Sequence, residues 1–435
     1  MATRSSIRSQ KFKKNGFDPF SFSALFSPFS RIFSFRLRVR CSSILALLWV
    51  AAALAKETGP HVGVFEMAPA ASALGAYRND SLNSWGGALL HVPEDPAWPY
   101  HMFASGFVEG CGLHAWETNS AIIHLVSKSM EQPFVLSDVA LPPWHHGVGA
   151  ARAPDGTFLL FTMGKTNLSN VVPCPEGVPA WPSSQNCTRP VCTGFDVRGH
   201  SSQSVYGPWT PITNINPASK YHGSHVLWNA VNPDPSPFIL PNGSVMVVGG
   251  GVHAAPHWKG PYLSVPGPHL EANKTLNHDP RLHGGHAASE DAYLWYQQGR
   301  WRQMWHQKID DPTNHTNDHD QCAYFPYVGG YAVAKTEGYD GLSGEWAHQF
   351  FNPGFGLNVS LRNGSSVCLS RRERPKLVSI EGRMWLTNGA MLDGVAGDGP
   401  ADRGTYTFIQ EVLSIPEVLN LTGPVVGTSR PTTES

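Results

Sequence analysis

The sequence has few charged residues and no excess of either sign. Asp, Glu, Lys and Arg make up 15 % of its 435 residues, and the formal net charge is −1. Outside the N-terminal stretch no basic run follows the chain, so nothing in it favours a polyanion. We therefore expect no nucleic-acid partner.

Helical periodicity and a bilayer-length apolar run are missing as well. The apolar run ILALLWVAAALA, residues 44–55, is shorter than the roughly 20 residues that a membrane span needs. It follows a segment, residues 1–43, that holds nine Lys/Arg and one acidic residue, and it closes on Ala-Leu-Ala. This layout is that of a secretory signal. The long basic segment keeps an uncleaved anchor, with its N-terminus in the cytoplasm, as the alternative.

These features predict a leader and a destination. We expect residues 1–55 to be a signal peptide or signal anchor, residues 56–83 a leader segment, and the protein to be secreted, lumenal or a type II membrane protein. Nine N-x-[ST] sequons among 21 asparagines support export. The sequon asparagines are Asn79, Asn167, Asn186, Asn242, Asn273, Asn314, Asn358, Asn363 and Asn420.

The sequence lacks a C-x-x-C pair, which argues against a zinc ribbon. After Ala55 it has six cysteines, and an even set in an oxidising compartment predicts disulfides. The six are Cys111, Cys174, Cys187, Cys192, Cys322 and Cys368. We expect Cys174, Cys187 and Cys192 to cross-link one long loop through disulfide bonds. The full disulfide connectivity stays open.

Glycine, proline and aromatic residues are plentiful, and four stretches repeat one pattern of strand, tight turn and strand. They are residues 146–164, 232–250, 289–307 and 372–390. Their turns read Asp155-Gly156, Asn242-Gly243, Gln298-Gly299 and Glu381-Gly382, which are hairpin sequences. A looser fifth copy covers residues 85–105. Repeated antiparallel units of this kind are typical of a β-propeller.

The predicted fold is therefore all-β: a five-bladed β-propeller with antiparallel blades over residues 84–415, followed by a disordered tail at 416–435. A β-sandwich is the alternative, and the in-register repeats disfavour it. In a propeller the first strand of each blade lines the central channel. Nine residues before the turn glycine stand Asp234, Glu290 and Glu373, whereas the second blade has Gly147. We expect these carboxylates to meet at one mouth of the channel.

At these residues the chain resembles the five-bladed furanosidase propellers, above all the family 43 glycoside hydrolases and their invertase and levansucrase relatives. The resemblance covers about residues 84–414 and rests on Asp234-Pro235-Ser236, Glu290-Asp291, Glu373-Arg374-Pro375 and the Gly-Pro-Trp at 207–209. It implies that Asp234 is the general base, that Asp291 tunes its pKa with Glu290 as competitor, and that Glu373 is the general acid. The family trio lies on the first three blades, whereas here it falls on the last three.

The expected function is glycoside hydrolysis, of the inverting type, because an oxocarbenium-like transition state needs one protonated and one ionised carboxyl group. A lectin-like propeller without catalysis is the alternative, since blade one offers Ser-Trp-Gly-Gly where the family has its base. A sialidase-type enzyme that uses the arginines is disfavoured, because the sequence offers no nucleophilic tyrosine at a recognisable site.

Several other residues are candidates for binding the sugar. Arg372 and Arg374 suit a carboxylate or sulfate, and Trp85 and Trp144 suit stacking on a sugar face. His146 precedes the channel position of the second blade. Short-spaced histidines (His145-His146, His278/His283/His286, His315/His319) are favoured as surface or channel residues over metal ligands. We expect no metal, no cofactor, a carbohydrate substrate and a monomer.

Overall fold

The computed structural model describes residues 65–72, 75–164, 171, 173–174, 195–230, 233–268, 291–306, 329–348, 354–392 and 404–416. The chain divides into two units, Met1–Glu57 and Thr58–Ser435, and all described residues belong to the second. The predicted signal segment, residues 1–55, and the tail after Pro416 lie outside the described residues, as do Glu290, Cys187, Cys192, Cys322 and five of the clustered histidines. Within these ranges, no helix is long and apolar enough to cross a bilayer.

The described strands form five antiparallel sheets. Blade I contains β2 (Asn83–His91), β3 (Tyr100–Phe107), β4 (Ser120–Ser127) and β5 (Val135–Leu141). Blade II contains β6 (His145–Arg152), β7 (Phe158–Gly164), β8 (Phe195–Ser202), β9 (Thr210–Pro211) and β10 (Trp228–Ala230). Blade III contains β11 (Ser236–Ile239), β12 (Val245–Val248), β13 (Val252–Ala255) and β14 (Leu263–Val265).

Blades IV and V complete the set. Blade IV contains β15 (Tyr293–Gln297), β16 (Arg300–His306), β17 (Gly329–Ala334) and β18 (Trp346–His348). Blade V contains β19 (Asn358–Ser360), β20 (Ser366–Ile380), β21 (Arg383–Leu392), β22 (Thr405–Ser414) and β1 (Glu66–Met67). Two short 3-10 helices, η1 (Leu113–Ala115) and η3 (Tyr339–Ser343), lie between strands.

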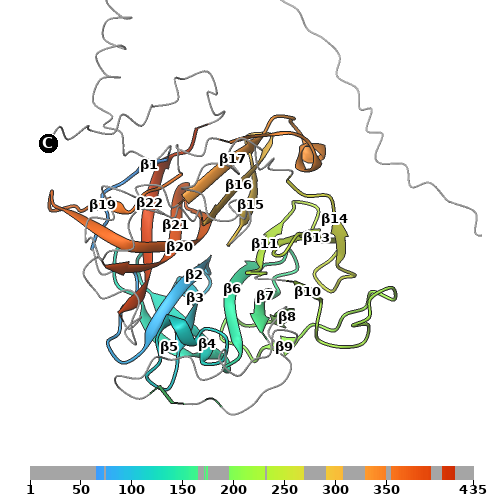
Figure 1. Ribbon diagram of the computed structural model, residues 1–435, viewed down its shortest axis with the longest axis horizontal. Helices are drawn as coiled ribbons and strands as arrows, with labels where there is room; N and C mark the ends of the chain where they lie inside the picture. Colours follow the sequence, from blue (N-terminus) through green and yellow to red (C-terminus); the bar gives the residue numbers. More distant parts are fainter. Residues whose placement is uncertain are drawn as a thin grey trace, which may run out of the picture. The chain divides into compact units, whose positions relative to one another are not determined.

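The five sheets stand in a ring around one axis (Figure 1). The first strand of each hairpin faces the axis: β2 contacts β6, β6 contacts β11, β11 contacts β15, β15 contacts β20, and β20 contacts β2. This closed cycle is a five-bladed β-propeller, so the predicted fold is confirmed. The stretches 146–164 and 372–390 are the β6–β7 and β20–β21 hairpins of separate blades, as expected.

The N-terminal strand β1 closes the ring, because it pairs antiparallel with β22 at the outer side of the last blade. Glu66 lies opposite Ser414 in this pair. The sheet therefore takes in residues from the stretch that the sequence analysis assigned to a leader segment. Hydrogen bonds between β1 and β22, which lie far apart in the sequence, therefore join the two ends of the described chain within one blade.

Burial between the blades explains the sequence of the middle strands. Strands β3, β4, β7, β12 and β17 are apolar along most of their length and largely buried, since each blade packs against a neighbour on both faces. Each blade-to-blade interface has its own apolar cluster; between blades I and II, for example, Phe103 and Ile122 pack with Phe158 and Leu160. At about 25 cal/mol per Å² of buried apolar surface, these five clusters supply the main stabilising term.

At an equivalent position within or just before each innermost strand stands a residue with a left-handed backbone. These residues are Gly86 (φ 67°), Gly147 (φ 60°), Asp234 (φ 25°), Asp291 (φ 59°) and Arg374 (φ 56°). Each stands six residues before the residue that opens the turn of its hairpin, namely Val92, Ala153, Leu240, Gln297 and Ile380. The five kinks therefore lie at one level of the ring. The kink redirects the side chain, and it is at this level that the charged residues of blades III to V meet.

A disulfide joins Cys111, which follows β3 in blade I, to Cys174, which follows β7 in blade II. Cys174 therefore pairs across two blades rather than with Cys187 or Cys192. Cys368 is disulfide-bonded as well. Oxidised cysteines fit an oxidising compartment.

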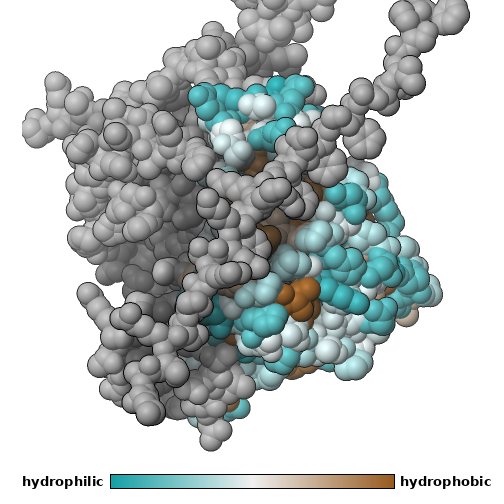
Figure 2. Space-filling model, turned by 90° about the vertical axis from the view of Figure 1, so that its right-hand side faces the viewer, coloured by the Kyte–Doolittle hydropathy of each residue, from teal (hydrophilic) through white to brown (hydrophobic). Residues whose placement is uncertain are grey.

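The described surface is mostly hydrophilic on the side that Figure 2 presents. The sequon asparagines among the described residues, Asn79, Asn242, Asn358 and Asn363, are all exposed. Their positions leave room for glycans, which is what an N-glycosylated surface requires.

Candidate functional site at the axis

Two carboxylates from blades III and IV flank one guanidinium from blade V at the axis. Arg374 Nη1 donates a hydrogen bond to Asp234 Oδ1, and Arg374 Nε lies 3.8 Å from Asp291 Oδ1. The side chains of Asp234 and Asp291 are only 4 % and 2 % exposed. We call the group formed by Asp234, Asp291, His306, Glu373 and Arg374 the axial cluster.

Glycines on blades I and II make room for this cluster. A Cβ atom at Gly147 would overlap Asp234 Oδ1 and would lie 2.8 Å from Arg374 Nη1. A Cβ atom at Gly86 would lie 3.4 Å from Arg374 Cδ. The kink positions of the first two blades thus lack side chains where those of the other three carry charges. Arg374 uses the freed space to reach across to Asp234.

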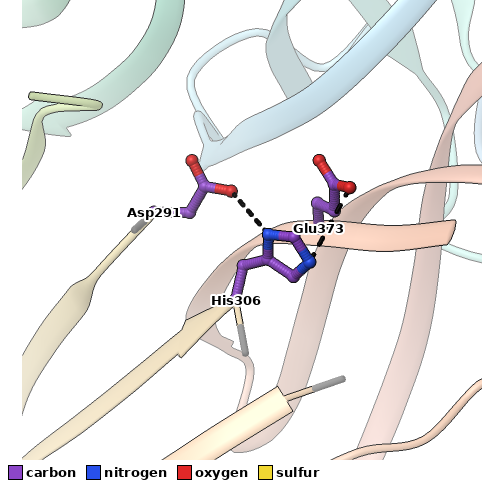
Figure 3. A group of neighbouring side chains, drawn as sticks. All are labelled: Asp291, His306 and Glu373. Carbon is purple, nitrogen blue, oxygen red and sulfur yellow. Dashed lines mark ion pairs between the residues drawn. The ribbon is translucent and has the colours of Figure 1, made fainter. Parts of the chain in front are cut away.

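His306 connects the second aspartate to Glu373, as Figure 3 shows. His306 Nδ1 lies 3.7 Å from Asp291 Oδ2, and its Nε2 lies 3.7 Å from Glu373 Oε1. The β15–β16 register explains the first contact: Tyr293 pairs with Met304, so Asp291 and His306 stand opposite each other two residues further on. Glu373, on β20, is the most exposed carboxylate of the cluster, with 18 % of its side chain accessible.

Burial and charge push the pKa values of the two aspartates apart. Burial raises the pKa of Asp234 well above its usual value, against the opposing effect of Arg374. Burial also raises the pKa of Asp291, but Arg374, a hydrogen bond with Asp234, His306 and Lys376 outweigh it and leave that pKa below the usual value. Asp234 therefore keeps its proton to a higher pH than Asp291. The charge of Asp291 and its hydrogen bond to Asp234 contribute to the raised pKa, so Asp234 is the more basic carboxyl of the pair.

Lys376 brings a second cation to the aspartate pair. Its Nζ donates to Ser236 Oγ at 2.8 Å, which links blade V to blade III. Burial lowers the pKa of Lys376 to about 8, although Asp234 and Asp291 pull it upward. Two cations thus balance the two carboxylates in a region that water barely reaches.

Three members of the axial cluster also have the donor types of a metal site. Ligand atoms of Asp291, His306 and Glu373 lie within 4.8 Å of one another, and such mixed N/O sets suit divalent cations. Arg374, only 3.8 Å from Asp291 Oδ1, already supplies a positive charge there. The neighbouring guanidinium and ammonium groups oppose a further cation at this position.

Arg372, predicted to bind substrate at the channel mouth, does not reach the axis. It is 2 % exposed and donates hydrogen bonds to Asn388 Oδ1, Gly356 O and Gln410 Oε1. Its guanidinium also lies 4.7 Å from the ring centre of Phe355 and 5.2 Å from that of Phe408. The alternation of side chains along β20 turns Arg372 into the core of blade V, so it does not share the environment of its neighbours Glu373 and Arg374.

Two of the predicted binding residues are buried, and a third is half-buried. Trp85 is 1 % exposed and packs against Gly389, so it presents no ring face to a ligand in this structure. His146 is buried, with Nδ1 2.7 Å from Ser120 Oγ and its ring against Trp116. Trp144 is half-buried and has a left-handed backbone, φ 72°. Trp295 of β15 is also buried, with its ring against Tyr331.

The sequence analysis missed His306 and Lys376. The signal for His306 was present in the hairpin: it lies seven residues after Gly299, and Asp291 lies seven residues before Gln298. A two-residue turn at Gln298-Gly299 places them opposite each other. No comparable signal identifies Lys376, because its partner Ser236 is on another blade.

Comparisons with known proteins give structural likeness only. No protein-family model matches the chain, and no curated protein matches it. A family 43 glycoside hydrolase from Bacillus licheniformis is 15 % identical with a TM-score of 0.44, and the match covers 77 % of this chain and 54 % of that one. This chain therefore spans about half the length of that protein.

Two further solved structures are similar over most of their length. A family 43 β-xylosidase/α-arabinofuranosidase from a compost microbial metagenome, in complex with xylotriose, is 12 % identical with a TM-score of 0.43, and the match covers 79 % of this chain and 93 % of that one. A family 117 glycoside hydrolase from the marine bacterium Zobellia galactanivorans is 11 % identical with a TM-score of 0.40 and coverages of 81 % and 90 %.

Proposed function

We propose that the chain is a glycoside hydrolase that acts on a glycan at the axial cluster. The observation that supports this most is the convergence of Asp234, Asp291 and Glu373, from three different blades, within one connected network of side chains. Hydrolysis of a glycosidic bond uses two carboxyl groups in different protonation states. The axial cluster provides carboxyls whose surroundings differ in that way.

In this proposal Glu373 is the general acid and protonates the leaving oxygen. Glu373 is the most accessible carboxylate of the cluster. His306 Nε2 lies 3.7 Å from Glu373 Oε1, so a small movement of the imidazole would form a hydrogen bond that orients the carboxyl group. Asp234 is the general base for the attacking water, and Asp291 tunes the pKa of Asp234 upward through its charge and a hydrogen bond, against the effect of Arg374. Inversion at the anomeric carbon is part of the proposal.

Arg374 is a positioning residue in this account. Its guanidinium contacts both aspartates, and the neighbouring glycines hold no side chain that could displace it. When Asp234 ionises, Arg374 stabilises the carboxylate that activates water. Removal of the guanidinium would leave two buried carboxyls facing each other, which favours the protonated form of both.

A secretory route and a monomeric state belong to the same proposal. The disulfide between Cys111 and Cys174 fits an oxidising compartment, and the described sequon asparagines are exposed. The closed ring needs no second copy to complete the axial cluster, since all of its residues come from one chain.

A carbohydrate-binding propeller without catalysis is the second candidate. Asp234 and Asp291 are nearly inaccessible and are engaged with Arg374, which is what a purely structural ion-pair network would also show. In that case Glu373 and its neighbours would only contact a sugar.

Hydrolysis of a glycan panel tests the proposal against this alternative. The full chain, expressed through a secretory host, is incubated with neutral and acidic polysaccharides, and reducing ends are counted. We expect release by the parent protein and a loss of roughly 10²–10⁴-fold in Glu373→Gln. Glu381→Gln is the matched control, because Glu381 lies on the turn of the same hairpin, far along β20, with 63 % of its side chain exposed. Binding to a glycan array without hydrolysis by the parent protein would decide for the second candidate.

A further inference from the structure

Blade II contains a second group of polar side chains, away from the axial cluster. Among the described residues, four buried atoms on β7 and β8 have no hydrogen-bond partner: Arg198 Nε and Nη2, His200 Nδ1 and Thr162 Oγ1. Thr162 is fully buried, His200 is nearly so, and the Arg198 side chain is 12 % exposed. Buried polar atoms are rarely left without partners, and each such atom costs about 1–3 kcal/mol.

The strand register places these atoms on one face of the sheet. Thr162 of β7 pairs directly with Arg198 of β8, so their side chains lie side by side. His200 follows two residues after Arg198 and therefore points to the same side. His145, at the start of β6, completes the group, since its ring centre lies 5.3 Å from that of His200. Figure 1 shows β6, β7 and β8 as neighbours in blade II.

The one carboxylate nearby does not satisfy the guanidinium. Asp196 Oδ2 lies 3.7 Å from Arg198 Nη2, which is longer than a hydrogen bond, and Asp196 Oδ1 accepts from Asn229 Nδ2 at 3.1 Å. Arg198 Nε and Nη2 are thus left without an acceptor, on the same face of the sheet as Thr162 and His200. The face therefore has several donors and a shortage of acceptors.

We propose that this face of blade II binds an oxyanion, the carboxylate or sulfate ester group of an acidic sugar. A carboxylate or a sulfate ester can accept two N–H bonds from one guanidinium through two of its oxygens, here from Nε and Nη2 of Arg198. Its remaining lone pairs suit the Thr162 hydroxyl and the Nδ1–H tautomer of His200. The group would thereby supply the acceptors that all four atoms lack. Asp196 favours a singly charged oxyanion, because a second negative charge would be repelled.

The choice of a sugar as carrier rests on the proposed function, whereas the oxyanion itself does not. His145 lies two residues before Gly147, the kink residue that borders the axial cluster. A glycan whose acidic unit occupied blade II would therefore extend along β6 toward the axis. The glycan would be selected by charge before its glycosidic bond reached the carboxylates.

Thermal shifts with small oxyanions test the site independently of catalysis. The full chain is titrated with sodium acetate and sodium methyl sulfate, against sodium chloride at equal ionic strength, and then with glucuronate and galactose 6-sulfate against glucose. We expect a saturable rise in Tm with oxyanions and none with glucose. The two sugars tell a carboxylate from a sulfate ester as the preferred group.

Two variants locate the effect. Arg198→Gln removes the guanidinium, and Thr162→Val removes only a hydroxyl while it keeps the shape of the side chain. We expect oxyanion affinity to fall roughly tenfold to a hundredfold in Arg198→Gln and less in Thr162→Val. Arg152→Gln, at the far end of β6 with 39 % of its side chain exposed, is the control and should bind as the parent does.

Two outcomes would overturn the proposal. If oxyanions raise Tm no more than chloride does, or if Thr162→Val and Arg198→Gln respond as the parent does, the four atoms are solvated by internal water instead. Should Arg198→Gln fail to fold, Thr162→Val decides alone. If acetate binds but no glycan is hydrolysed, the oxyanion site on blade II is supported and the proposed glycoside hydrolase activity is refuted.

Discussion

Arg374 and Asp234 form an ion pair across the axis of the ring, between blade V and blade III. The pair passes through space that Gly147 of blade II leaves open. Buried charge pairs are costly to form and costlier to break, because removal of one partner leaves the other charge unpaired. The pair therefore fixes the relative positions of two blades that share no hydrogen-bonded strand.

Gly147→Ala should disrupt this pair. The new methyl group would overlap Asp234 Oδ1 and crowd Arg374 Nη1, and the residue would keep a left-handed backbone at φ 60°. We expect the free energy of unfolding, measured in urea, to fall by about 3 kcal/mol or more. Gly156→Ala is the control: its φ is 87°, but its nearest neighbour, Arg152 Nη2, is 3.9 Å away. It should lose only the backbone strain, about 1–2 kcal/mol. Equal losses of unfolding free energy in both variants would mean that the steric contact at Gly147 does not contribute to stability.

Arg372→Met should destabilise the protein without a specific effect on carbohydrate binding. The change removes three hydrogen bonds, to Asn388, Gly356 and Gln410, and leaves their acceptors buried. We expect a loss of about 2–4 kcal/mol in unfolding free energy and an unchanged glycan affinity in the folded fraction. A variant of normal stability but weakened glycan binding would restore Arg372 to the role that its sequence position suggested.

A buried pair of histidines predicts that stability falls in acid. His101 Nδ1 and His124 Nε2 are 2.9 Å apart, and both rings are fully buried. Asp138 Oδ2 lies 3.0 Å from His124 Nδ1, while Asp95 Oδ2, itself bonded to the Tyr206 hydroxyl, lies 3.6 Å from His101 Nε2. Burial, and then the neighbouring His124, lower the pKa of His101 to about 4, although Asp95 and Glu94 oppose this.

Because the folded-state pKa of His101 lies below the ordinary value of 6.5, the unfolded chain takes up the proton first as the pH falls. The stabilisation is complete above pH 6.5 and is lost progressively down to about pH 4, by about 3 kcal/mol. Tm measured from pH 8 to pH 4 should show this slope, and His101→Gln should be less stable at neutral pH but less sensitive to acid. Parallel profiles for parent and variant would assign the acid sensitivity to other groups.

Local sequence patterns predicted the hairpins well but misaligned the charged residues by one position. Counting nine residues back from the turn glycine matched Asp234 with Glu290 and Glu373. The β6–β7 and β11–β12 hairpins have three-residue loops, whereas β15–β16 and β20–β21 have two-residue turns. The structural equivalents of Asp234 are therefore Asp291 and Arg374. The length of each turn decides the register. The sequence alone does not show that length, because the three-residue loops and the two-residue turns have the same x-Gly pattern.

The axial contacts themselves were beyond local patterns. That Gly147 leaves space for Arg374 depends on how five blades close, since these two residues belong to blades II and V. The burial of Arg372 depends likewise on Phe355 and Phe408, which meet it only in the folded blade. The blade number and the convergence of the three carboxylates could be predicted, because both follow from repetition. The pairing of charges could not.

The most direct test of the account compares Glu373→Gln and Asp234→Asn on aryl glycosides with good and poor leaving groups. A substrate that leaves as a weakly basic phenolate needs little protonation, so Glu373→Gln should retain most of its turnover on 2,4-dinitrophenyl glycosides and lose about 10²–10⁴-fold on methyl glycosides. Asp234→Asn should lose activity on both, because water activation is needed whatever leaves. Equal losses of Glu373→Gln on both substrates, or normal turnover in Asp234→Asn, would contradict the assignment of acid and base.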